Sequence, residues 1–178
     1  MLKKYAALLV AMGVILAMAG CAQPTATDAP ESGTAPYTAP ETPEVPPAAT
    51  APTAESVWTQ TLESGAYKSW QRAPGYETQQ PAKGPHGKKV DVYVNDAVTK
   101  ALATPGTAAW PAGSMIVKDA FDAAGKLVSM EYMEKTDQGW YYATFDTTGK
   151  SAKQGVQVAP CQPCHTKGSD SVMAFKLP

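Results

Sequence analysis

The segment from residue 22 to residue 54 sets the strongest limit on how this chain can fold. Its 33 residues include eight prolines, nine alanines and seven threonines, and only Tyr37 and Val45 are large and apolar. Such a composition cannot bury enough apolar surface to form a core. Repeated proline instead favours an extended chain of about 3 Å per residue, which predicts a long tether. We therefore expect one folded domain over residues 55–178, large enough to fold without disulfides.

The first 20 residues have the pattern of an export signal. Lys3 and Lys4 precede an apolar run, and small residues then lead to Cys21. A charged start, an apolar stretch and a small-residue cleavage point are the parts of a secretory signal peptide. An uncleaved membrane anchor is the alternative, but the apolar run is shorter than the roughly 20 residues that span a bilayer. The Ala-Gly-Cys ending resembles the lipobox of bacterial lipoproteins, which implies that Cys21 carries lipid.

These two segments predict a protein of the bacterial cell envelope. Residues 1–20 are expected to be a signal peptide, and residues 21–54 a lipid-attachment cysteine with a disordered tether. The domain at 55–178 is then lipid-anchored to a membrane and faces the periplasm or the exterior. Its 13 basic and 12 acidic residues leave it close to neutral, so no nucleic-acid partner is expected.

Alternating apolar and polar residues predict an antiparallel sheet in the folded domain. Four strands are expected, over residues 89–95, 114–121, 126–135 and 140–145. Helical spacing predicts one amphipathic helix over residues 55–70, and a capping Asn95 or Asp96 predicts a short helix over 97–103. The pattern favours an α+β domain, in which a meander of antiparallel strands is covered by helices on one face.

The sharpest motif lies near the C-terminus, at Cys161-Gln-Pro-Cys164-His165. C-x-x-C-H is the attachment motif of c-type haem. Two cysteines three residues apart reach the two vinyl groups on one porphyrin edge, and His165 then faces the iron as its proximal ligand. One covalently attached haem c is therefore the expected cofactor.

Two other chemistries use a cysteine pair of this spacing. A redox C-x-x-C normally opens a helix after a strand in a βαβ unit, and the pattern predicts no such unit. A zinc site needs four ligands, whereas the one other histidine is His86. The export predicted for residues 1–20 also favours a haem site over the other two, since covalent haem attachment in bacteria takes place outside the cytoplasm.

The position of the motif indicates an open coordination site on the iron. Only 13 residues follow His165, so a ligand for the opposite face of the haem would come from upstream. Met173 is expected to be a core contact on the proximal side. The iron is then five-coordinate and binds a small molecule. Cytochromes c-prime place the motif similarly, but they are four-helix bundles, and the strand pattern disagrees with that fold.

Several further segments resemble the cytochrome P-460 family, and the resemblance covers residues 58–178. In chain order they are Tyr67-Lys-Ser-Trp70, Gly84-Pro-His-Gly87, Val90-Asp-Val-Tyr-Val-Asn95, Trp110-Pro-Ala-Gly-Ser114, Ile116-Val-Lys118, Met133-Glu-Lys135 and Gly139-Trp-Tyr-Tyr142. The resemblance implies an antiparallel sheet with helices packed on it, a c-type haem with a reachable distal side, and a homodimer.

The same resemblance implies three alternative functions. In the enzymes that name the family, a lysine is cross-linked to the porphyrin edge, and by motif that residue is Lys118. Those enzymes oxidise hydroxylamine and pass electrons to an acceptor protein, so a redox partner is implied. Related members such as cytochrome c-prime-beta bind nitric oxide or carbon monoxide without that activity. A plain electron carrier is the third alternative.

Three residues outside the haem motif are candidates for the site. Strand alternation places Lys118 among apolar neighbours, where burial would lower its pKa and leave a nucleophilic amine, unless the side chain extends to solvent. Glu131 is a candidate for the distal carboxylate that takes protons from a bound substrate, and a solvent-facing residue is its alternative. His86 is expected to anchor its loop rather than to bind iron.

Overall fold

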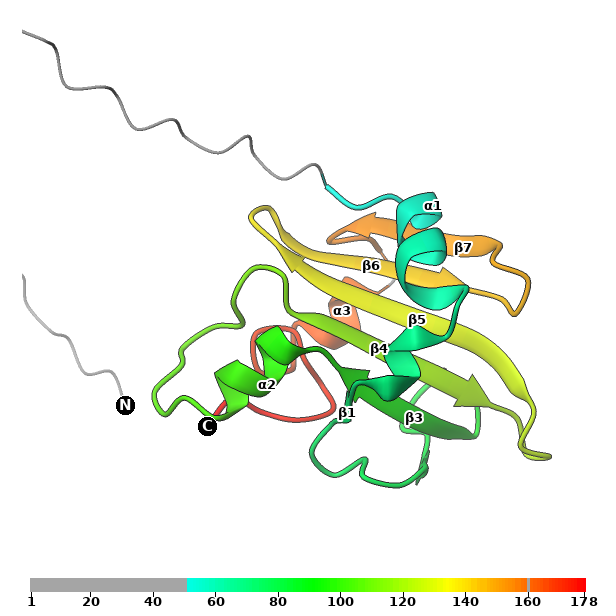
Figure 1. The fold of residues 1–178 in the computed structure, drawn as a ribbon, viewed down its shortest axis with the longest axis horizontal. Helices are drawn as coiled ribbons and strands as arrows, with labels where there is room; N and C mark the ends of the chain where they lie inside the picture. The colour runs from blue at the N-terminus through cyan, green and yellow to red at the C-terminus, as the bar shows by residue number, and fades with distance from the viewer. Residues whose placement is uncertain (1–50, 160) are drawn as a thin grey trace, which may run out of the picture. The chain divides into compact units, whose positions relative to one another are not determined.

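The computed structural model describes residues 51–159 and 161–178, so the predictions for Cys21, the signal peptide and most of the tether lie outside the described residues. An antiparallel sheet forms the centre of the domain (Figure 1). Its strands are β1 (Gln71–Arg72), β2 (Gln80–Pro81), β3 (Lys89–Val94), β4 (Met115–Phe121), β5 (Leu127–Thr136), β6 (Gly139–Phe145) and β7 (Ser151–Val156).

The strands follow one another across the sheet as a meander. Their order is β1-β3-β4-β5-β6-β7, and β2 also pairs with β3, further along the same edge. From β3 onward each strand pairs with its successor in the chain, all antiparallel. The predicted α+β class and the four predicted strands are confirmed. β1, β2 and β7 were not predicted.

Alternation along the strands gives the sheet two different faces. Val90, Val92 and Val94 on β3 all belong to one buried cluster, as their spacing predicts. On β4, Ile116 belongs to this cluster, whereas its neighbour Val117 belongs to a second cluster on the opposite face. Each face therefore has its own core and its own covering segment.

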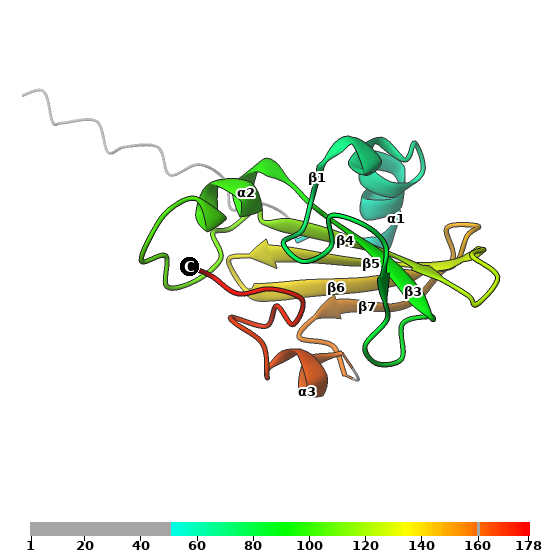
Figure 2. The ribbon, with the colours of Figure 1, turned by 90° about the horizontal axis from the view of Figure 1, so that it is seen from below.

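Short helical turns at the start of the domain cover one face of the sheet (Figure 2). They are α1 (Ala54–Val57), the π-helical turn η1 (Trp58–Leu62) and the 3₁₀ turn η2 (Ala66–Ser69). The prediction of one continuous helix over residues 55–70 is wrong. Gly65 has a φ of +68°, a left-handed conformation that ends the helix before η2 begins.

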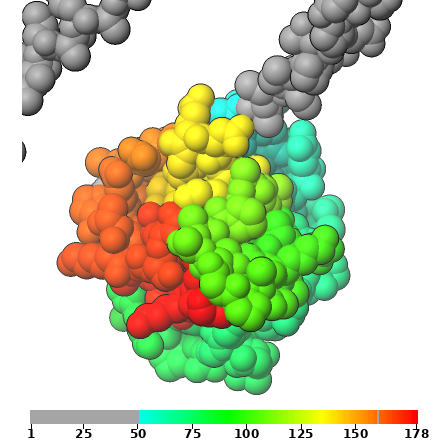
Figure 3. All heavy atoms as spheres, turned by 90° about the vertical axis from the view of Figure 1, so that its left-hand side faces the viewer, coloured from blue at the N-terminus to red at the C-terminus, as the bar shows by residue number. Residues whose placement is uncertain are grey.

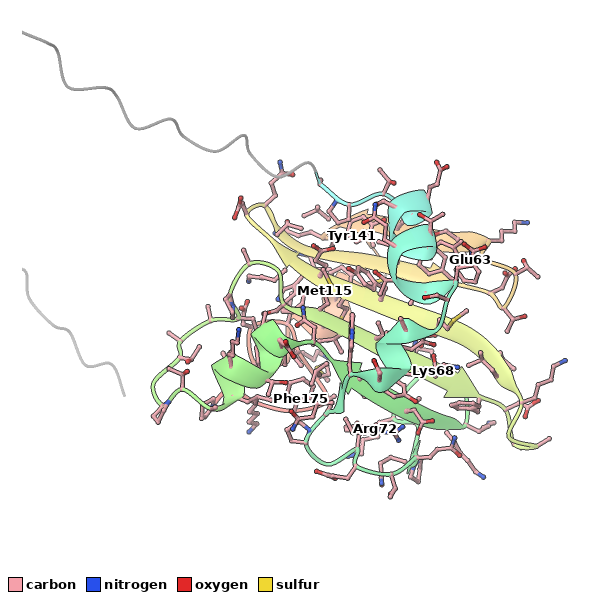
Figure 4. All side chains as sticks on the ribbon, viewed as in Figure 1. Glu63, Lys68, Arg72, Met115, Tyr141 and Phe175 are labelled. Carbon is pink, nitrogen blue, oxygen red and sulfur yellow. The ribbon has the colours of Figure 1, made fainter. Side chains whose placement is uncertain are left out.

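This helix-covered face fixes the orientation of β4. Asp119 is buried there and accepts a 2.6 Å hydrogen bond from the Tyr67 hydroxyl of η2. The Lys68 ammonium lies 3.6 Å from the same carboxylate, and Figure 4 labels Lys68 on this side of the sheet. Because side chains alternate along a strand, holding Asp119 on this face directs Lys118 to the other face.

The second face is covered by α2 (Asp96–Leu102) and by the C-terminal segment, which lie beside each other in Figure 3. The Asn95 side chain accepts a hydrogen bond from the Val98 backbone N–H, which confirms the predicted cap. The rings of Trp110 and Phe175 meet edge to face at 5.4 Å. The fold therefore places the C-terminal segment, with the cysteine motif, directly against the sheet.

Met173 does not make the predicted core contact. It is 54% exposed, whereas its neighbour Val172 and the nearby Phe175 are buried in the cluster of this face. The chain reverses at Asp170 and Ser171, and this turn directs Val172 rather than Met173 inward. Within residues 51–159 and 161–178, no helix is long and apolar enough to cross a membrane.

Candidate functional site

A cavity of about 320 Å³ lies between the sheet and the C-terminal segment. This volume falls within the range of small-molecule and cofactor sites, roughly 300–1,000 Å³. Residues of β3, β4, β5 and β6 line one side, and the loop before β3 lines another. The one-turn helix α3 (Gln162–His165) and residues 172–174 complete the lining. The sequence-predicted site residues Lys118, Glu131, Cys161, Cys164 and His165 all line this cavity.

The cysteine motif forms a single helical turn at the cavity wall. Cys161 is the N-cap of α3, and the His165 backbone N–H donates to the Cys161 carbonyl at 3.2 Å. Cys161 is half-buried and Cys164 exposed, and both are free thiols. Burial raises the pKa of the Cys161 thiol. This turn therefore places both sulfurs and the imidazole of His165 along one wall.

His165 is held by a backbone acceptor. Its Nδ1 lies 3.0 Å from the Ser171 carbonyl oxygen, an arrangement in which Nδ1–H donates and Nε2 keeps its lone pair. The ring of Tyr142 meets the imidazole edge to face at 5.2 Å. Burial lowers the pKa of His165, which favours the neutral imidazole that a metal requires. His165 thus presents Nε2 as a free metal ligand.

Lys118 and Glu131 are direct cross-strand neighbours on the cavity face of β4 and β5. The sequence-predicted alternation of β4 is therefore confirmed. Burial lowers the pKa of Lys118, although the charge of Glu131 opposes this shift. Such a lysine has a larger fraction of neutral, nucleophilic amine than an exposed one.

The two carboxylate oxygens of Glu131 have different surroundings. Oε1 accepts a 2.7 Å hydrogen bond from the Ser129 hydroxyl and lies 3.5 Å from Nδ1 of His86. Oε2 is buried and has no hydrogen-bond partner among the residues that the structure describes. Burial raises the pKa of Glu131, but His86, the charge of Lys118 and Ser129 outweigh burial and lower the pKa overall. Glu131 is therefore an ionised carboxylate with one oxygen free.

His86 reaches Glu131 because its loop approaches β4 closely. The next residue, Gly87, has a φ of +71°, and a Cβ there would lie 2.8 Å from the Phe121 carbonyl oxygen. Only glycine fits that approach without displacing backbone. The loop-anchoring contact expected for His86 is therefore its contact with the Glu131 carboxylate in the cavity.

The chemistry of this cavity fits a covalently held haem. Two thiols at the required spacing and an oriented imidazole lie on one wall, and an unpartnered buried carboxylate oxygen and an amine lie in the same cavity. A closed zinc site would need four ligands. Among the residues that the structure describes, no three His, Cys, Asp or Glu side chains group together as metal ligands.

Sequence reasoning did not find two groups that position the site. The Ser171 carbonyl holds His165, and the Ser129 hydroxyl holds Glu131. A backbone carbonyl carries no side-chain signal in a sequence. Ser129 lies two residues before Glu131 on β5, a spacing that places both on one face, and this is the signal that would have indicated it.

Comparison with known protein families gives a match for most of the folded domain. A family model described as Cytochrome P460 matches residues 65–176, which is more than half of the chain. The match extends from the break between η1 and η2 to the C-terminal segment, and it includes every residue of the cavity named above. No curated protein matches the chain.

Proposed function

The chain belongs to the cytochrome P460 family, and from this membership we propose that it oxidises hydroxylamine or a similar small nitrogen compound. Members of this family are c-type haem cytochromes, so the chain is a cytochrome that binds haem c covalently. The proposal concerns what this haem does. We assign one haem to the site, and the substrate would bind beside it in the cavity.

We assign the attachment to the motif on α3. Cys161 and Cys164 form the thioether bonds, and His165 binds the iron through Nε2, supported by its hydrogen bond to the Ser171 carbonyl. When bound, the haem iron supplies the acceptor for the electrons that leave the substrate. A redox partner protein then receives these electrons from the cytochrome.

The free Oε2 of Glu131 is the observation that carries the enzymatic proposal. A buried, ionised carboxylate oxygen without a partner is costly unless a ligand supplies a donor. The N–H and O–H groups of hydroxylamine are such donors. Oxidation of this substrate also releases protons, and an ionised carboxylate in the cavity accepts them. Ser129 and His86 hold Oε1, which leaves Oε2 for the substrate.

A cross-link through Lys118 is the feature that would make this chain resemble the hydroxylamine-oxidising members of the family rather than the gas-binding ones. Its amine lines the cavity, and its lowered pKa supports nucleophilic reaction with the porphyrin edge. We propose that Lys118 is cross-linked to the haem by a C–N bond that replaces one N–H of the amine and one C–H of the porphyrin edge, with a peroxide as the two-electron oxidant that is reduced to water. Such a bond would alter the macrocycle, which is one of the ways in which a protein tunes haem reactivity.

Binding of nitric oxide or another diatomic gas is the second candidate function. Val90, Val92, Ile116 and Met133 contribute apolar side chains to the cavity, which suit an uncharged diatomic ligand. A plain electron carrier would need a side chain on the sixth position of the iron. His86 is the candidate for it, because His86 lines the cavity and a carboxylate at Nδ1 leaves Nε2 for a metal.

The cellular setting remains a proposal drawn from the sequence. Residues 1–20 act as a signal peptide, Cys21 carries the lipid, and the proline-rich segment tethers the domain to a membrane of the bacterial envelope. The protein also forms a homodimer in this proposal.

The substitution Glu131→Gln tests the enzymatic proposal. Glutamine keeps the shape but cannot accept a proton, so we expect the rate of hydroxylamine oxidation to fall by about 10²–10⁴-fold. Steady-state assays with an artificial electron acceptor measure the rate. Glu134→Gln is the matched control, because Glu134 lies on the same strand, accepts a hydrogen bond from the Tyr132 hydroxyl and does not line the cavity. An unchanged rate in Glu131→Gln would contradict the role of Glu131.

The pH dependence of the wild-type rate follows from the same carboxylate. A base works when it is ionised, and Glu131 has a pKa below the ordinary glutamate value. The acid limb of the pH–rate profile should therefore lie at a lower pH than an ordinary glutamate base would give, and a profile of kcat against pH measures it.

The proposed lipid anchor can be tested on the mature protein. The mature protein should lack residues 1–20 and carry a diacylated Cys21, because Cys21 follows the Ala-Gly pair of a lipobox-like sequence. Intact mass spectrometry of membrane-extracted protein measures both features. Cys21→Ser should release the domain into the soluble fraction with its haem attached. An unmodified Cys21, or a retained leader, would refute the anchor.

A further inference from the structure

The turn that holds the proximal histidine has a strained backbone. Asp170 and Ser171 have φ values of +43° and +67°, a left-handed conformation that residues other than glycine rarely adopt. They are the central pair of a tight reversal, in which Ser169 and Val172 exchange two backbone hydrogen bonds of 3.0 and 3.1 Å. Backbone strain persists only where the surroundings enforce it, and it is concentrated at functional sites.

The surroundings of Asp170 enforce this turn through its side chain. Nζ of Lys135, at the end of β5, lies 2.9 Å from each carboxylate oxygen. The Trp110 backbone N–H donates to Oδ2 at 2.9 Å. A charged side chain and a backbone donor from two separate segments therefore meet on one carboxylate.

Two tryptophan rings hold the backbone of the same turn. The indole N–H of Trp140 donates to the Asp170 carbonyl at 2.7 Å, and that of Trp110 donates to the Ser169 carbonyl at 3.1 Å. Both rings are buried against the sheet. The next carbonyl along the chain, that of Ser171, is then directed at Nδ1 of His165.

We propose that Asp170 is a positioning residue that sets the strength of the proximal iron ligand. Its ion pair with Lys135 fixes the turn, the turn fixes the Ser171 carbonyl, and this carbonyl accepts the Nδ1–H of His165. The inference rests on the assignment of His165 as the iron ligand, and it is independent of what the haem oxidises or binds.

The direction of the effect follows from ligand chemistry. An acceptor held at Nδ1–H raises the basicity of the imidazole and strengthens its bond through Nε2. A more basic ligand favours the oxidised iron, so it lowers the reduction potential. If the Ser171 carbonyl is held less firmly, its hydrogen bond to Nδ1–H of His165 becomes weaker. The iron–histidine bond should then weaken and the reduction potential should rise.

Asp170→Asn in the full-length protein with its haem attached tests the proposal. Asparagine tolerates a positive φ, so this change removes the charge without adding backbone strain. We expect the iron–histidine stretching band of the reduced protein to move to lower frequency in resonance Raman spectra. We also expect the reduction potential to shift upward. Neither readout depends on enzymatic activity.

A second variant removes the other half of the ion pair. Lys135→Met should shift both readouts in the same direction, and the double variant should shift them by less than the sum, because each change breaks the same link. Asp91→Asn is the matched control. Asp91 pairs with Arg72, labelled in Figure 4, and the side chains of this pair are 15% and 26% exposed, against 23% and 19% for Asp170 and Lys135. The control should leave both readouts unchanged.

The outcomes separate this proposal from the assignment of the ligand. An iron–histidine band in the wild-type protein, unmoved in Asp170→Asn and Lys135→Met, would overturn the positioning role and leave His165 as the ligand. If His165→Gly kept the wild-type band, the ligand assignment would fail, and the positioning role would fail with it. If Asp170→Asn does not retain haem, Lys135→Met decides by the same two readouts.

Discussion

Replacement of Lys118 by alanine is expected to abolish hydroxylamine oxidation while the haem stays attached. The thioether bonds and His165 suffice to hold the cofactor, whereas the proposed cross-link depends on the Lys118 amine alone. The wild-type protein should therefore show a red-shifted spectrum when reduced, and Lys118→Ala should show an ordinary c-type spectrum. A haem peptide from the wild-type protein should contain Lys118 as well as both cysteines of α3.

The control for this substitution is Lys118→Arg. Arginine keeps a cation beside Glu131 but has no amine that can react with the porphyrin edge. It should behave like alanine in the spectrum if the cross-link is responsible. An ordinary c-type spectrum in the wild-type protein would remove the main support of the enzymatic proposal. Gas binding in the apolar part of the cavity would then be the better account.

The largest effect on the cofactor is expected from Cys161→Ala together with Cys164→Ala. The double variant should lose its haem on denaturing electrophoresis, because no thioether remains. A haem-peroxidase stain of the gel measures this loss directly. Cys21→Ala is the matched control, since Cys21 is the third cysteine of the chain and should not affect the stain. Wild-type haem that runs at the solvent front would contradict covalent attachment.

The fold was predictable wherever side-chain alternation reports burial. β3 shows this most clearly, because Val90, Val92 and Val94 all pack into one core. The edge strand β7 was missed because its residues are mostly polar and include Gly155, so no period of two is visible. The helix over residues 55–70 was wrongly extended, because helical spacing of apolar residues does not register the left-handed Gly65.

The candidate site was predictable where a local motif specifies chemistry. Cys161, Cys164 and His165 were predictable from their spacing alone. Lys118 was predictable from the alternation along its strand and from the resemblance of its segment to the family. The link between His86 and Glu131 joins residues 45 positions apart, so only the folded chain reveals it. Met173 was misplaced for a related reason. The turn that buries Val172 and leaves Met173 in the cavity lining depends on Asp170 and its distant partners, and no local pattern indicates them.

The meander described above has a consequence for the order of folding. Strands β4, β5, β6 and β7 pair only with their neighbours in the chain, so these contacts are mostly local, which favours rapid folding. The cysteines of α3 come after the last of these strands. The sheet, with Lys118 and Glu131 already on one face, can therefore form before the haem arrives. An exposed Cys164 then offers the attachment segment to haem on the surface of a largely finished domain.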